Sequence, residues 1–163
     1  MSQQHPSTKP YKTHFDHLTD MKESLGKEIG LTEWVNIDQQ RINDFADATE
    51  DHQWIHVDPE RSKQHSPYGT TIAHGLLVLS LLPKFTYEVY SFGDVVMGVN
   101  YGFDRVRFPN ATKANDQIRA RISVLTYKEI PGGARFTLKA EVEIKGEEKP
   151  ACVAEFIGQA YVG

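Results

Sequence analysis

The sequence predicts an α+β fold in which an antiparallel sheet wraps around one long central helix. The stretch that follows Ile72-Ala73-His74-Gly75 is apolar on almost every side, which is typical of a helix buried on several faces. The second half of the chain instead alternates apolar with polar residues, as strands with one wet face do. The dry face of such a sheet must be covered, and the apolar helix is the element that can cover it.

Two helices are predicted in the first half. One begins at Asp38, because the following residues share one face at helical spacing: Ile42, Phe45, Ala46 and Thr49. The other is the apolar helix, which runs through LLVLSLLPKFTYEVYS after Gly75. Pro83 lies inside this second stretch and should kink the helix or end its regular part.

The strands of the sheet are predicted in the second half. Residues 118–124 and 136–144 each alternate between apolar and polar side chains, and Pro131-Gly132-Gly133 joins them as a hairpin. Residues 95–107 and 151–162 add further strands, which gives a four- or five-stranded antiparallel sheet.

The chain has the length of one domain, with 163 residues. Residues 1–20 are expected to form a loosely ordered N-terminal arm, and residues 21–163 the single domain. The net charge is −4 and no basic stripe is visible, so neither a nucleic acid nor a membrane surface is an expected partner.

The expected location is the cytoplasm. A single cysteine, Cys152, cannot form an internal disulfide, which fits a reducing compartment. Residues 1–20 hold no apolar stretch of the length that a secretory signal needs, and no segment approaches the length of a membrane span.

The densest group of chemically active residue types lies between the two predicted helices. Asp58-Pro59-Glu60 is a strong helix start, so residues 51–57 are expected to form a connection. In this connection Asp51 and His56 could converge on one water, with the carboxylate orienting the imidazole as a proton carrier. The alternative is a surface aspartate and a half-buried histidine that caps a turn.

No metal is expected. His52 and His56 have the i,i+4 spacing that binds metal on a helix, but the helix start at Asp58 argues against a continuous helix through both. The sequence also contains no CxxC or HExxH motif.

A second candidate segment leads into the apolar helix. A helix N-terminus offers unpaired N–H groups to an oxyanion, and Gly75 would allow a substrate to approach the backbone. The alternative gives Thr71 a capping role and makes His74 and Gly75 packing residues. Arg105 and Arg107, near a strand end, could meet phosphates or could simply be solvated.

Several of these segments, in this order, resemble the MaoC-like dehydratases, which are (R)-specific enoyl-CoA hydratases of the hot-dog fold. The resemblance rests on Asp51 and His56 in a D-x4-H loop, on Ile72-Ala73-His74-Gly75, and on the apolar helix that follows. It is closer to the nodulation-protein-N-like branch in residues 45–61, Asn100-Tyr101-Gly102, Val106-Arg107-Phe108-Pro109 and residues 149–155. Where the family loop usually reads G-D-x-N-P-x-H, this chain has Glu50, Gln53 and Trp54 in place of the glycine, asparagine and proline.

The resemblance implies an enoyl-CoA hydratase that adds water to a trans-2-enoyl-CoA. It implies that Asp51 and His56 activate the water and that the Gly75 N–H stabilises the thioester oxygen. Substrate-binding residues are expected at Trp54, Ile72, His74 and Arg107. The family often adds a serine or threonine further along the helix; Ser80 is nearby here, whereas Pro83 aligns best. No cofactor is implied, the acyl-CoA thioester is the expected substrate, and a homodimer is the expected assembly.

Two other functions remain open at this point. A hot-dog thioesterase normally has a carboxylate on or beside the central helix, and residues 71–85 contain none. A non-catalytic acyl-CoA-binding protein is the other alternative, because a fold does not fix a function. The retention of both Asp51 and His56 argues against this binding protein.

Overall fold

The computed structural model describes residues 7–163, so the first six residues of the expected N-terminal arm lie outside the described residues. Its main sheet is antiparallel, with the strand order β2-β6-β7-β8-β5 and with β3 paired to β6. The strands are β2 (Glu28–Leu31), β3 (Val35–Ile37), β5 (Val95–Arg107), β6 (Asp116–Ile130), β7 (Gly133–Ile144) and β8 (Cys152–Val162). The sheet therefore has six strands rather than four or five. The two that the sequence did not reveal, β2 and β3, are too short to show an alternating pattern.

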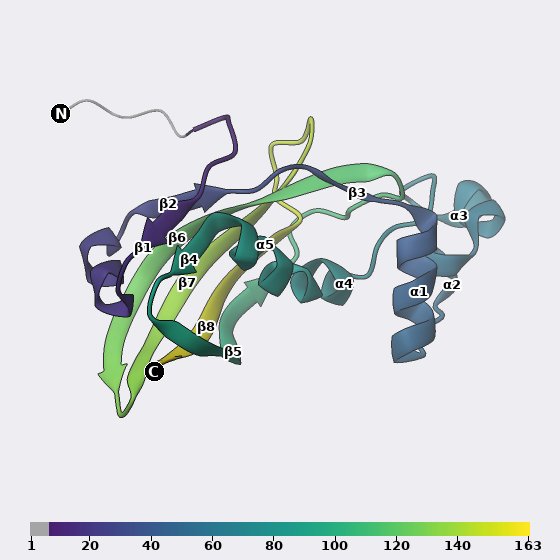
Figure 1. The fold of residues 1–163 in the computed structure, drawn as a ribbon. Coiled ribbons are helices and arrows are strands. Elements are labelled where there is room, and N and C mark those ends of the chain that lie inside the picture. Colours follow the sequence, from purple (N-terminus) through teal and green to yellow (C-terminus); the bar gives the residue numbers. More distant parts are fainter. Residues whose placement is uncertain (1–6) are drawn as a thin grey trace.

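The sheet curves around the central helical segment, as predicted (Figure 1). This segment is two helices, α4 (Gly75–Ser80) and α5 (Leu82–Val89), which meet at Leu81. Pro83 lies in the first turn of α5, where its missing N–H has no intrahelical partner to lose. The prediction that Pro83 interrupts the helix is therefore confirmed.

The core forms where these helices meet the concave face of the sheet. Leu82 and Phe85 from α5 are fully buried, as are Ile118 and Ile122 from β6. Burying one such side chain contributes roughly 1.5–3 kcal/mol, so this contact between helix and sheet holds the central segment in place.

Three helices lie together at one end of the sheet: α1 (Gln39–Thr49), α2 (Trp54–Val57) and α3 (Pro59–His65) (Figure 1). The predicted helix start at Asp38 is confirmed, since its side chain accepts a hydrogen bond from the Arg41 N–H at 2.9 Å. The helix start at Asp58 is confirmed in the same way, with the Arg61 N–H as donor at 2.9 Å. The expected connection at residues 51–57 contains the short helix α2. Within residues 7–163, no helix has the length and apolar character that crossing a bilayer requires.

The described part of the expected arm lies on the domain. β1 (Thr13–Phe15) pairs in parallel with β4 (Tyr90–Phe92), and the 3-10 helix η1 (Leu18–Ser24) follows. Phe15 and Leu18 are buried in the core. The boundary that we placed at residue 20 thus falls within η1. The sequence before it is mostly polar, so it gave no sign that Phe15 and Leu18 belong to the core.

Candidate active site

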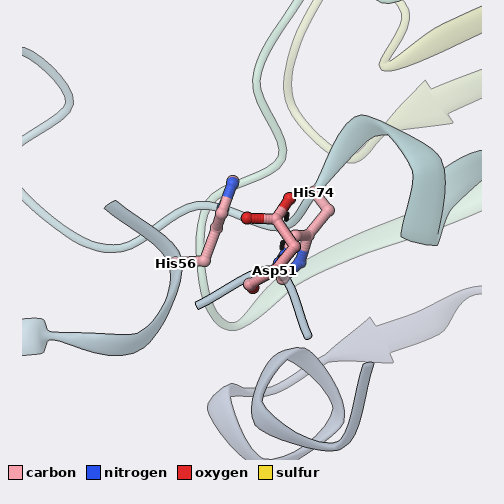
Figure 2. Close-up of side chains that lie close together, drawn as sticks. All are labelled: Asp51, His56 and His74. Carbon is pink, nitrogen blue, oxygen red and sulfur yellow. Dashed lines mark hydrogen bonds and ion pairs between the residues drawn. The ribbon is translucent and has the colours of Figure 1, made fainter. Parts of the chain in front are cut away.

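Three segments bring Asp51, His56 and His74 together (Figure 2). The chain turns at Glu50, which ends α1 in a left-handed conformation with φ of 62°, and Asp51 follows directly. His56 lies on α2, and His74 immediately precedes α4. One carboxylate oxygen of Asp51 and one nitrogen from each ring lie within 4.8 Å of one another. The predicted convergence of Asp51 and His56 is thus present, and His74 joins it.

His56 is held as a neutral base. It is 7% exposed, and its Nδ1 lies 2.7 Å from the carbonyl oxygen of Ile72. Because a carbonyl oxygen can only accept, Nδ1 carries the proton and Nε2 keeps a free lone pair. Burial lowers the pKa of His56 below its usual 6.5, and the neighbouring His74 lowers it further, which outweighs the opposing effects of the Ile72 carbonyl and Asp51. His56 is therefore unprotonated at neutral pH.

Asp51 lies on the solvent-exposed side of the same group of residues. Its side chain is 53% exposed, and one carboxylate oxygen lies 4.0 Å from Nε2 of His74. The backbone of Asp51 is better fixed, since its carbonyl oxygen lies 2.9 Å from the same His74 nitrogen. The site therefore pairs a solvated carboxylate with a buried imidazole.

A cavity of about 350 Å³ opens beside His56. Its walls include Ile72, Ala73 and Gly75 and the segment Phe108–Thr112. Gly75 is the first residue of α4, where backbone N–H groups have no intrahelical acceptor. A Cβ at this position would lie 2.8 Å from the ring of Phe108, so only glycine fits without a shift of that ring. The cavity thus combines a base with the amide-rich start of a helix.

The four expected substrate-binding residues do not lie together in the structure. Ile72 lines the cavity, whereas His74 is 3% exposed and is packed behind it. Trp54 is half-buried, with the Arg61 guanidinium 4.5 Å from its ring, and Arg107 is exposed and bonds to the Val106 carbonyl. Of these four residues, Ile72 alone lines this cavity within residues 7–163.

Ser80 does not complete the group. Its hydroxyl donates to the Leu77 carbonyl of its own helix at 2.7 Å. The hydrogen bonds that hold the site come instead from backbone carbonyls of Asp51 and Ile72.

The pair considered for metal binding is separated. His52 is exposed and lies 2.8 Å from Asp47, while His56 is buried. Asp51, His56 and His74 do offer ligand-type atoms, but the two imidazoles are stacked, with centroids 3.8 Å apart and 23° between their planes. Imidazole lone pairs lie in the ring plane, and one ion cannot lie in two stacked planes. The arrangement suits proton transfer better than metal ligation.

Some cavity residues were not singled out by the sequence. Tyr68, Asn110, Thr112 and Ala151 line the cavity, and the Thr112 hydroxyl is buried without a hydrogen-bond partner among residues 7–163. These residues lie in loops and at strand ends, where periodicity gives no signal. Two segments that carried part of the family resemblance were available clues: Val106–Pro109 leads directly into this wall, and residues 149–155 include Ala151.

Comparison with known proteins agrees with this geometry. A family model described as "MaoC like domain" matches residues 20–145. The chain is 43% identical over 144 residues to 3-hydroxyacyl-thioester dehydratase Z of Mycobacterium tuberculosis, covering 88% of this chain and 95% of that protein. It is also 43% identical over 143 residues to nodulation protein N of Rhizobium leguminosarum bv. viciae, covering 86% and 88%. An R-hydratase structure from Pseudomonas aeruginosa superposes with a TM-score of 0.67 at 19% identity, over 82% of this chain and 81% of that one, which confirms the hot-dog fold.

Proposed function

This chain belongs to the MaoC-like family, and we propose that it is an (R)-specific enoyl-CoA hydratase. The reaction adds water across the double bond of a trans-2-enoyl-CoA and gives the (R)-3-hydroxyacyl-CoA. The similarity to a 3-hydroxyacyl-thioester dehydratase and to an R-hydratase supports a hydro-lyase. The observation that carries the proposal is that His56, whose Nδ1 is bonded to the Ile72 carbonyl, lines the cavity and has a ring nitrogen within 4.8 Å of an Asp51 carboxylate oxygen.

The chemistry follows from this arrangement. A water held between Asp51 and His56 loses a proton to the pair as its oxygen bonds to the β-carbon. The π electrons of the double bond move toward the thioester carbonyl, whose developing negative charge the Gly75 N–H stabilises. The pair then returns a proton to the α-carbon, so that the net change is the addition of one water. These steps involve no net oxidation or reduction, and side chains carry the protons, so we propose no cofactor beyond the coenzyme A of the substrate.

The test follows the loss of conjugated-enoyl absorbance from crotonyl-CoA and from a longer trans-2-enoyl-CoA. Wild type, Asp51→Asn and the control Asp47→Asn are compared, since Asp47 is an exposed aspartate of α1. We expect (R)-3-hydroxyacyl product from wild type and control, and little from Asp51→Asn. Release of free CoA would identify a thioesterase. Binding of acyl-CoA without turnover would identify a non-catalytic binding protein.

We also propose that the protein is a homodimer joined along β5. This strand is at the edge of the sheet and exposes several large apolar side chains: Val96, Met97, Val99, Tyr101 and Phe103. An unprotected edge with such side chains is a template for pairing with another strand, and a second copy supplies one. A cytoplasmic location is part of the proposal, because Cys152 is free and buried.

A further inference from the structure

We propose that His74 is a positioning residue of this site, which fixes the backbone of Asp51 and supports the ring of His56 so that both face the same water. The inference rests on the proposed hydration and adds a role for a side chain that lies outside the cavity wall. His74 is 3% exposed, so it acts through Asp51 and His56 rather than on the substrate.

The first contact concerns Asp51. Nε2 of His74 lies 2.9 Å from the Asp51 carbonyl oxygen, and because that oxygen only accepts, Nε2 carries the proton. Asp51 follows the end of α1 and its side chain is largely exposed, so this buried hydrogen bond anchors a residue that its own surroundings hold weakly.

The second contact concerns His56. The two imidazoles stack with their centroids 3.8 Å apart, and the ring of Phe45, on α1, lies 4.9 Å from that of His74. His56 is thus held by the Ile72 carbonyl in its ring plane and by His74 against its face. These two contacts set the direction in which the free Nε2 of His56 points.

The third observation concerns Nδ1 of His74. This atom is buried and has no hydrogen-bond partner among residues 7–163. The hydrogen bond from Nε2 to Asp51 is therefore the ring's polar contact within the described residues, and the rest of the ring touches its neighbours through its faces. His74 thus serves as a hydrogen-bond donor and as a flat support.

The groups around His56 are few. The titratable side chains that act on it are His74 and Asp51, and the Ile72 carbonyl is the third influence. From α1, Gln39 donates to the His56 carbonyl at 2.7 Å, and Phe45 carries no charge. The cavity side presents Tyr68, Asn110 and Thr112. A change at His74 should therefore be visible in the titration of His56.

Two variants separate the two contacts. His74→Phe keeps a ring against His56 and loses the donor to Asp51, whereas His74→Gln keeps an N–H donor at the same reach and loses the ring. A displacement of about 1 Å can cost about 100-fold in rate, so we expect kcat to fall about 100-fold in His74→Phe, with KM changed less than threefold. His74→Gln should stay within about tenfold of wild type. His65→Gln, at the exposed end of α3, is the control.

Titration of the His56 ring by NMR gives a readout that does not depend on activity. His74→Phe preserves burial and removes a neighbour that lowers the pKa of His56, so the titration should move to higher pH. A folded His74→Phe with wild-type kcat and an unchanged titration overturns the proposal. If this variant does not fold, an unchanged His56 titration in His74→Gln overturns it. Inactive wild type would instead overturn the hydratase assignment, and the NMR titration would still test the positioning.

Discussion

The Nδ1–H of His56 donates to the carbonyl oxygen of Ile72 at 2.7 Å, and this bond decides which nitrogen is available for chemistry. Ile72 lies just before α4. The segment that leads into the central helices therefore also fixes the tautomer of His56. The same short segment supplies His74 behind His56 and Gly75 at the cavity wall. The candidate site is therefore assembled where α2 and the end of α1 meet the start of the central helical segment.

The acid dependence of the reaction should report on His56. Because its pKa lies below 6.5, the base is present above that pH and is lost as the pH falls through its folded value. We expect kcat/KM to be level just above pH 6.5 and to decline below it. The unfolded chain binds the proton more readily, so the free energy of unfolding should also decrease in this acid range. An acid limb centred above pH 6.5 would contradict this assignment, and His65→Gln should leave the profile unchanged.

Gly75→Ala should damage activity through crowding rather than through loss of a charge. The new Cβ would lie 2.8 Å from the Phe108 ring, so either the ring or the start of α4 must move. A shift of about 1 Å at the donor would lower kcat/KM by about 100-fold. Gln64→Ala, at an exposed position of α3, is the control. Combining Gly75→Ala with Phe108→Leu should recover part of the loss; no recovery would show that crowding by Phe108 is not the cause.

The proposed dimer predicts sensitivity to charge along β5. The double variant Met97→Lys, Val99→Lys places two cations on the exposed edge, and like charges meeting across a symmetric interface repel. We expect wild type to sediment as a dimer at micromolar concentration and the variant as a monomer. Leu125→Lys, which changes an exposed apolar residue of β6, should stay dimeric. A monomeric wild type would refute the interface.

Arg121 should contribute to stability without affecting the reaction. Its guanidinium donates to Glu28 at 2.9 Å, to Glu143 at 3.1 Å and to the Ser7 carbonyl at 3.0 Å, and its side chain is 16% exposed. Removing a charged donor from half-buried partners costs about 1–3 kcal/mol, so Arg121→Leu should lower the free energy of unfolding in urea by that amount. Lys84→Leu breaks an exposed i,i+4 pair with Glu88 and should cost about 0.5 kcal/mol or less. Equal losses in the two variants would argue against a special role for Arg121.

Periodicity and capping residues made most of the fold predictable. Asp38 and Asp58 begin helices where their side chains can accept first-turn N–H bonds, and the alternating residues of β6 and β7 face the core in turn. β2 and β3 escaped prediction because three or four residues do not establish a period. β1 also escaped, because its pairing with β4 joins residues far apart in the chain.

The site was predictable in part. Asp51 and His56 stood out because few other residue types can share a proton near neutrality. The position of His74 behind His56 depends on how α2 packs beside the start of α4, which no local pattern encodes. No local pattern encodes the position of Thr112 either, whose backbone carbonyl accepts a hydrogen bond from the Ala73 N–H at 2.7 Å.

The contacts of the N-terminal segment set an order of events during synthesis. The Leu18 N–H bonds to Asp94, 76 positions later, and Arg121 bonds to the Ser7 carbonyl across 114 positions. Closing such long loops is slow compared with pairing β6 and β7, whose strands are joined by a tight turn. The N-terminal segment can therefore form these contacts only after the residues up to Asp94 and Arg121 have left the ribosome.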